Sequence, residues 1–120
     1  MSNNDLLLSN IIEGILEKKG QEIVTLDLTK VQNSFCDHFV ICHAESNTQV
    51  NAIADSIEKK VKENMSEKAG HREGIENALW ILLDYSSVIV HVFQRDIRHY
   101  YQLEELWGDA RITRIEDSFN

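Results

Sequence analysis

Two titratable side chains, Asp84 and His91, stand in two neighbouring apolar segments, residues 78–85 and 87–93. A charged group is costly to bury in such a segment unless it is paired or lies at a surface with a function. With Ser87 they supply the side-chain types of a serine hydrolase, but the sequence has no nucleophile elbow. The pattern favours either a covered sheet in which Asp84 ends a strand or a recognition surface, and it leaves open whether Asp84 and His91 meet.

Four potential metal ligands fall within one short segment: Cys36, His38, Cys42 and His43. Residues 37–43 have the composition of a strand, and on a strand His43 points away from the face that the other three share. No second pair of ligands follows at the spacing of a zinc site. We therefore expect no metal site, and two buried, reduced thiols.

Signatures of other enzymes are also missing from the sequence. A nucleotidyltransferase needs a Gly-Ser turn and two carboxylates one residue apart on a strand, which hold magnesium and a triphosphate. The sequence has no Gly-Ser dipeptide, and Glu13 and Glu17 are four residues apart in a helical segment. Neither a P-loop nor a dinucleotide-binding glycine pattern is present. We expect no catalytic residue, no cofactor and no enzymatic activity.

The two apolar segments predict an antiparallel hairpin that turns near Tyr85, Ser86 and Ser87. Side chains alternate between the faces of a sheet, so a loop with an even number of residues gives one aliphatic and one mixed face. The aliphatic face comprises Leu79, Ile81, Leu83, Val88, Val90 and Val92, and the mixed face Trp80, Leu82, Asp84, Ile89, His91 and Phe93. In the tightest such hairpins Trp80 lies opposite His91 or Phe93, whereas an odd loop or a bulge would exchange the partners.

The remaining sequence predicts the elements that position this hairpin. We expect a helix at 5–19 ended by Gly20, strands at 22–28 and 37–43, a helix from Ser46 to Met65, a flexible link at 70–74, the hairpin, a last helix from about Asp96, and a polar tail from Gly108 to Asn120. Ser46 followed by Gln49 is a capping-box pattern. The expected fold is α/β (α+β), a single mixed sheet with helices packed on it, in the order α-β-β-α-β-β-α.

The chain of 120 residues has the size of one domain, with a core at about 5–112 and a tail at 113–120 that we expect to be flexible. Its net charge of −8 disfavours a nucleic-acid backbone as the main partner and suits a basic protein. No apolar run approaches the about 20 residues that span a bilayer. The first residues lack the basic start of a secretory signal, and we expect a cytoplasmic protein.

The last predicted helix carries more apolar surface than its own domain needs. Its apolar side chains cover an arc of roughly 220°, against about 100° for docking onto a sheet: Ile97, Tyr100, Tyr101, Leu103, Leu106 and Trp107. Exposed aromatic patches mark interaction sites, and Tyr and Trp are enriched among the residues that dominate binding energy. We expect part of this arc to lie at the surface, unless the tail or the first helix covers it.

Four segments, taken in their order and spacing, form a recognisable pattern. They are Asp27-Leu28 with Asp37-His38-Phe39-Val40-Ile41-Cys42; Ser46-Asn47-Thr48-Gln49-Val50 and on to Asp55; Glu73-Gly74 with Trp80-Ile81-Leu82-Leu83-Asp84-Tyr85; and Val90-His91-Val92-Phe93 with Arg98-His99-Tyr100-Tyr101-Gln102-Leu103-Glu104-Glu105-Leu106-Trp107. Over about residues 5–112 the chain resembles the ribosomal silencing factor family, RsfS, also called Iojap or DUF143. It departs from that family's pattern at Thr48, where a basic residue is common, and at Ser86, where glycine is common.

The resemblance implies a nucleotidyltransferase-like fold without the catalytic residues. It also implies binding to the large ribosomal subunit through the basic ribosomal protein uL14, which blocks joining of the small subunit and represses translation under nutrient limitation. A role in late assembly of the large subunit is a further implication. Contact with ribosomal RNA would be secondary at most, and no membrane is implied.

We expect the partner surface to be formed or bordered by residues of the mixed face and the last helix. These are Trp80, Asp84, Tyr85, His91, Tyr100, Leu103, Glu104 and Trp107. The aromatic side chains would anchor the partner, and the carboxylates would pair with its basic residues. His91 has an alternative role as a hydrogen-bonded core histidine. A homodimer that pairs the aromatic side of the last helix remains an alternative that is compatible with ribosome binding.

Overall fold

The computed structural model describes residues 3–74 and 76–115 of the chain. Its elements are α1 (Asn3–Glu17), β1 (Gln21–Asp27), β2 (His38–Ala44), α2 (Asn47–Met65), β3 (His71–Gly74), the short 3-10 helix η1 (Glu76–Ala78), β4 (Trp80–Asp84), β5 (Val88–Gln94), α3 (Arg95–Tyr101), α4 (Leu103–Leu106) and β6 (Arg111–Arg114). The strands form one sheet in the order β3-β4-β5-β2-β1-β6. Only β2 and β5 run parallel, so the sheet is mixed, as predicted.

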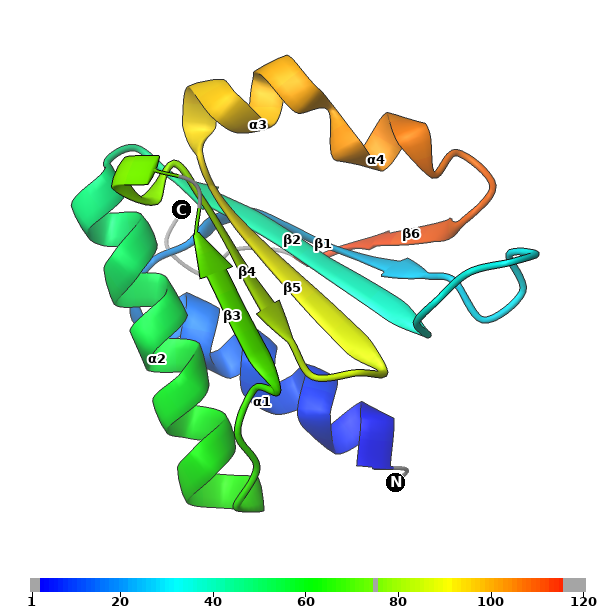
Figure 1. The fold of residues 1–120 in the computed structure, drawn as a ribbon, viewed down its shortest axis with the longest axis horizontal. Helices are drawn as coiled ribbons and strands as arrows, with labels where there is room; N and C mark the ends of the chain where they lie inside the picture. The colour runs from blue at the N-terminus through cyan, green and yellow to red at the C-terminus, as the bar shows by residue number, and fades with distance from the viewer. Residues whose placement is uncertain (1–2, 75, 116–120) are drawn as a thin grey trace.

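Helices cover both faces of this sheet (Figure 1). The long helices α1 and α2 lie together on one face, and the short helices α3 and α4 lie over the other. The residues of the sheet therefore divide into two cores. The first, under α1 and α2, contains Val40, Cys42, Ile81, Leu83, Val88, Val90 and Val92. The second, on the side of α3 and α4, contains Val24, Leu26, Phe39, Ile41, Ile89, Phe93 and Leu103.

The predicted hairpin is confirmed, with its register. Trp80 lies opposite Phe93, and Leu82 lies opposite His91. The aliphatic face packs in the first core and the mixed face in the second. Ser86 in the turn has a φ of 70°, a conformation that is easier for glycine than for serine.

Two edge strands occupy segments where no strand was predicted. β3 replaces the expected flexible link at 70–74, and β6 replaces part of the expected tail. Each is only four residues long and exposed throughout, so no alternation of apolar and polar residues marks it. Backbone pairing with β4 and with β1 holds them in place. Residues 116–120 of the predicted tail lie outside the described residues.

The ends of the long helices differ in detail from the prediction. Lys19, not Gly20, adopts the left-handed conformation after α1, with a φ of 59°. Gly20 donates its N–H to the carbonyl of Ile15 at 3.0 Å, and a Cβ on Gly20 would lie 2.3 Å from Ile15 Cγ2. Space, rather than a positive φ, therefore requires this glycine.

The capping box at the start of α2 is half formed. Ser46 Oγ accepts a hydrogen bond from the Gln49 N–H at 3.2 Å, as predicted. The Gln49 side chain does not return to Ser46, because it donates to the carbonyl of Lys18 at 3.1 Å. This contact fixes the start of α2 against the end of α1.

The predicted single last helix is wrong, because the chain breaks at Gln102. This residue has a φ of 46° and separates α3 from α4. The break turns α4 back over the sheet, where Leu103 packs into the second core. The expected surplus of apolar surface is nevertheless present, since Tyr100, Tyr101 and Leu106 are exposed.

Candidate functional site

A group of aromatic and apolar side chains lies on the α3–α4 side of the sheet, with Phe39 and His91 buried beneath the others. We call it the aromatic surface, and it comprises Phe35, Phe39, Trp80, His91, Tyr100, Tyr101, Leu106 and Trp107. Trp80 stands at its centre on β4, with ring centroids 4.7 Å from Phe93 beneath it and 5.0 Å from Tyr101 on α3. Tyr101 in turn packs edge-on against Tyr100 at 5.1 Å.

A second group of rings extends the surface toward β2 and the loop that precedes it. Phe39 contacts His91 at 4.7 Å and Trp107 at 5.5 Å, both at steep interplanar angles. Phe35 packs against the same Trp107 ring at 6.3 Å. Each ring touches the next, so the exposed rings at the two ends are connected through the buried rings of Phe39 and His91.

Three side chains of the patch are exposed to a degree that apolar residues rarely show. Tyr100 is 80% exposed, Leu106 is 73% exposed and Phe35 is 68% exposed. Phe35 packs against Phe39 at 6.1 Å, and Tyr100 packs against Tyr101, which in turn contacts Trp80. Firm, exposed aromatic patches are suited to docking, because little side-chain entropy is lost when a partner covers them.

The core histidine reading of His91 is supported by its hydrogen bonding. The indole N–H of Trp80 donates to His91 Nδ1 at 3.2 Å, so the proton of the neutral ring must be on Nε2. Nε2 has no hydrogen-bond partner among the described residues. Burial lowers the pKa of His91 to about 4, and the ring is neutral at physiological pH. His91 thus orients Trp80 from below.

Asp84 is occupied by the turn that follows β4. Its Oδ1 accepts the Ser86 N–H at 2.7 Å, which stabilises the turn with its positive φ. Asp84 lies opposite Ile89, whereas His91 lies opposite Leu82. Asp84 and His91 therefore make no hydrogen bond with each other. The Asp84 carboxylate is partly exposed at the margin of the mixed face.

Three other predicted site residues lie away from the exposed patch. Tyr85 was assigned to the mixed face, but it packs in the first core, where burial raises its pKa to about 12. Leu103 is buried in the second core and supports the patch from below. Glu104 forms an ion pair with Arg98 at 3.0 Å, so its carboxylate is already engaged within the chain.

Sequence reasoning left Phe35, Tyr101 and Leu106 out of the site. Phe35 follows the polar connection at residues 29–34. A lone aromatic side chain in such a loop is the signal that could have identified it. Tyr101 and Leu106 belonged to the predicted apolar arc. The break at Gln102 changes the directions of these two side chains relative to each other, compared with a straight helix.

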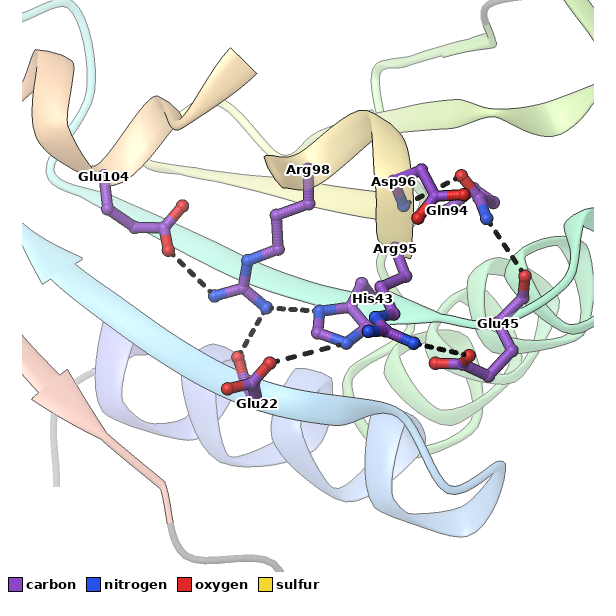
Figure 2. Close-up of polar contacts among 8 residues, drawn as sticks. All are labelled: Glu22, His43, Glu45, Gln94, Arg95, Asp96, Arg98 and Glu104. Carbon is purple, nitrogen blue, oxygen red and sulfur yellow. Dashed lines mark hydrogen bonds and ion pairs between the residues drawn. The ribbon is translucent and has the colours of Figure 1, made fainter. Parts of the chain in front are cut away.

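A polar network lies next to the aromatic surface and holds α3 and α4 (Figure 2). Gln94 caps α3 by accepting the N–H of Asp96 at 3.0 Å, and it also donates to the carbonyl of Glu45 at 3.1 Å. Arg95 pairs with the Glu45 carboxylate at 3.3 Å. These contacts fix the start of α3 to the loop that follows β2.

The buried centre of this network is Arg98. Its guanidinium donates to the carbonyl of Glu22 at 2.7 Å, to His43 Nδ1 at 3.0 Å and to the Glu104 carboxylate at 3.0 Å. Because His43 Nδ1 accepts, Nε2 carries the proton and faces the Glu22 carboxylate at 3.5 Å. Burial and the adjacent Arg98 lower the pKa of His43, so this ring is also held neutral.

One hollow borders the aromatic surface, and a second lies beside the Arg98 network. One, of about 200 Å³, is lined by Glu73, Gly74, Trp80 and Leu82 at the β3 edge. The other, of about 220 Å³, is polar and lies between β1 and the α3–α4 break, with Glu22, Arg98 and Glu105 in its lining. Both open to solvent, and neither has the enclosed shape of a small-molecule pocket.

Among the described residues, no group of three or more His, Cys, Asp or Glu side chains is placed to hold a metal ion. Cys36 precedes β2 and packs in the second core, whereas Cys42 packs in the first, so the expectation that they share a face is wrong. Burial raises the pKa of Cys36 to about 11 and that of Cys42 to about 12. Both thiols are therefore protonated, which makes them poor nucleophiles and metal ligands.

Residues 2–120 match the family described as "Ribosomal silencing factor during starvation". The chain belongs to the ribosomal silencing factor family. Within this family, ribosomal silencing factor RsfS of Halalkalibacterium halodurans is 40% identical over 116 residues, which cover 97% of each chain. The RsfS of Bacillus subtilis is 39% identical over 104 residues, which cover 87% of this chain and 86% of that relative.

A solved structure supports the fold of this family member. The crystal structure of a protein from Chromobacterium violaceum superposes with a TM-score of 0.82 and 31% sequence identity, covering 99% of this chain and 98% of the other. The matched relatives are named as silencing factors rather than as enzymes. No described helix is both long enough and apolar enough to cross a membrane.

Proposed function

We propose that this protein binds the large ribosomal subunit through ribosomal protein uL14 and blocks joining of the small subunit, which represses translation when nutrients are scarce. Membership of the ribosomal silencing factor family supports a ribosomal target in the cytoplasm. The aromatic surface is the observation that carries the mode of binding. It places exposed rings such as Tyr100 beside Trp80, which is half-buried and held between Phe93 and Tyr101.

The energy of docking would come from the centre of this surface. Trp80 is held by His91 and stacked on Phe93, so a partner that covers it gains apolar contact without ordering a mobile ring. Tyr100 extends from the same patch with most of its ring in solvent. Tyr and Trp in such positions are typical anchors of protein interfaces.

The charge of the molecule suits a ribosomal protein as partner. A net charge of −8 attracts a basic protein and repels the phosphate backbone of RNA, so any contact with ribosomal RNA is secondary. Asp84 lies at one margin of the patch with its carboxylate partly exposed. We expect it to pair with a basic side chain of uL14.

The proposed block is steric and needs no catalysis. The folded chain measures 34 × 33 × 30 Å. A body of this size on the joining face of the large subunit would occupy space that the small subunit must enter. Affinity for one surface and sufficient bulk beside it are the only requirements.

Sedimentation of purified ribosomal subunits with and without the protein tests this function. We expect the protein to co-migrate with large subunits and to reduce the fraction of joined ribosomes, and we expect immobilised uL14 alone to retain it. Joined ribosomes that form normally at saturating protein would contradict the proposal. Binding to large subunits that is unaffected by loss of uL14 would contradict the choice of partner.

Replacing Trp80 or Tyr100 by alanine tests the surface. Each change removes an anchor ring. Loss of a residue that dominates binding costs about 2 kcal/mol, which raises the dissociation constant about 30-fold. Affinity for large subunits is measured by co-sedimentation. Leu6→Ala is a matched control, because Leu6 is a 42% exposed apolar residue on α1, on the other face of the sheet. If both ring variants fold and bind as tightly as the control, the surface is assigned wrongly.

A homodimer formed through the same surface is the second candidate, since exposed rings can also pair with a second copy. Sedimentation velocity of the free protein distinguishes the two. A dimer that Tyr100→Ala dissociates, without any binding to large subunits, would favour a homodimeric adaptor over a ribosomal silencing factor. A role in late assembly of the large subunit uses the same docking and predicts accumulation of immature large subunits when the protein is absent.

A further inference from the structure

Arg98 joins four separate elements through one buried side chain. It lies on α3 and is only 6% exposed, yet its guanidinium reaches β1, β2 and α4 (Figure 2). A buried charge is costly unless its donors are satisfied. Here the acceptors are a backbone carbonyl at 2.7 Å, a ring nitrogen at 3.0 Å and a carboxylate at 3.0 Å.

The acceptors on the sheet are shaped to receive this guanidinium. β1 has an irregular register between Gln21 and Val24, and Glu22 at that point has a φ of 45°. This backbone conformation is unfavourable for any residue other than glycine. It presents the Glu22 carbonyl to Arg98, and His43 Nδ1 on the adjacent β2 accepts from the same nitrogen.

The third contact of the guanidinium crosses the break in the chain. Arg98 is the residue whose carbonyl accepts the Gln102 N–H at 2.9 Å, where α3 ends. Its side chain then pairs with Glu104, which belongs to α4. α3 has seven residues and α4 has four, lengths at which helices in water are not stable alone. Their mutual angle therefore depends on contacts with the rest of the molecule.

The side chains of the aromatic surface are distributed on both sides of this break. Tyr100 and Tyr101 lie at the end of α3, whereas Leu106 and Trp107 lie at the end of α4. From this we infer that Arg98 is the positioning residue of the docking surface, fixing the α3–α4 angle so that the two halves face one partner. This inference rests on the proposed function and specifies how its surface is organised.

Arg98→Gln tests the inference, with Arg98→Lys as the conservative variant and Ser56→Ala as the matched control. Glutamine removes the charge and the forked donors, and lysine keeps the charge without the fork. Ser56 is also buried, but its hydroxyl donates to the carbonyl of Gly14 at 2.8 Å between α1 and α2, on the other face. Ser56→Ala therefore lowers stability without altering α3 or α4.

The first measurement is amide hydrogen exchange of the free protein. In Arg98→Gln we expect the Gln102, Glu105 and Trp107 amides to exchange at least about tenfold faster, because they close the turns of the break. Arg98→Lys should be intermediate. Ser56→Ala should leave these three amides unchanged. Unchanged exchange of these amides in Arg98→Gln would overturn the inference without any reference to the ribosome.

The second measurement is affinity for large subunits at a temperature at which all variants are folded. We expect binding to weaken at least about tenfold in Arg98→Gln, less in Arg98→Lys, and not at all in Ser56→Ala. Equal affinity of Arg98→Gln and wild type overturns the inference and leaves the proposed function intact. Absence of wild-type binding overturns the proposed function instead. If Arg98→Gln does not fold, the same two measurements on Arg98→Lys decide.

Discussion

His91 has two neighbours that determine what it can do. The Trp80 indole donates to Nδ1, and the Phe39 ring stands edge-on at 4.7 Å. Protonation of Nδ1 would break the hydrogen bond from the Trp80 indole. It would also place a positive charge on a ring that solvent hardly reaches. The low pKa of about 4 follows from that burial. His91 is thus a support for Trp80 that functions only in its neutral form.

The pH dependence of stability should report this neutral histidine. In the unfolded chain His91 titrates near pH 6.5, whereas in the folded chain its pKa is about 4. Above pH 6.5 both states are neutral and the shift has no effect. As the pH falls from 6.5 to 4 only the unfolded state gains the proton, which lowers the free energy of unfolding by up to about 3 kcal/mol.

Urea unfolding at a series of pH values measures this effect in wild type and in His91→Gln. Glutamine keeps an acceptor for Trp80 and does not titrate, so we expect the variant to lose less stability between pH 6.5 and pH 4. His43, whose pKa is also lowered, should leave a smaller dependence in the variant. Parallel curves for the two proteins would show that His91 is not the group responsible.

At the scale of elements, α1 and α2 pack at a backbone-to-backbone contact. A Cβ on Gly14 would lie 2.9 Å from the Ile57 Cα and 3.1 Å from its backbone nitrogen. Backbone atoms cannot move aside as a flexible side chain can. The hydrogen bond from Ser56 to the Gly14 carbonyl at 2.8 Å holds the same crossing from the other helix.

Gly14→Ala should therefore destabilise the protein, although alanine is the better helix former. We expect a net loss of up to about 2 kcal/mol, since overpacking at the crossing costs about 1–3 kcal/mol and helix propensity returns about 1 kcal/mol. The measurement is the free energy of unfolding in urea. Ser9→Ala, at an exposed position of the same helix, is the control and should be neutral or slightly stabilising. A Gly14→Ala protein as stable as this control would show that the helices can separate at no cost.

The sequence predicted those elements whose burial is periodic. The hairpin of β4 and β5, the apolar stripe of α2 and the mixed sheet all follow from alternation or from three- and four-residue spacing. The break at Gln102 has no such signal, and the side chain that bridges it, Arg98, has acceptors that lie far away in the sequence on β1 and β2. The same holds for the site: rings of the predicted surface could be named, but which of them are covered depends on that break.

At the scale of the whole molecule, the sheet is open and its two short edge strands are held by different contacts. β3 is short and tied to α2, since Arg72 pairs with Asp55 at 2.9 Å and also with Glu58. β6 covers the other edge, where it pairs with β1 from Val24 to Asp27. Without β6, the strand at this edge would be β1, which is longer and contains Val24 and Leu26.

Truncation after Ala110 tests what β6 contributes. We expect the shortened protein to unfold at lower urea concentration, because the β1–β6 ladder and the bond from the Ile115 N–H to the Ile23 carbonyl at 2.9 Å are lost. We also expect it to self-associate through the unpaired β1 edge. Light scattering and urea unfolding provide the measurements. The double variant Arg111→Ala/Arg114→Ala keeps the backbone ladder and should scatter light as the wild type does, so aggregation of both proteins would point to charge instead.

The pairing of β1 with β6 joins residues at 24–27 to residues at 111–114, the greatest sequence separation of any strand pair in this sheet. Closing so long a loop has a high entropy cost, which slows the pairing. The two strands can pair only after both have been synthesised. During synthesis, one edge of β1 therefore stays unpaired while the other strands of the sheet are made. We expect this interval to be the time at which the nascent chain depends most on chaperones, and slow translation of residues 95–114 to lengthen it.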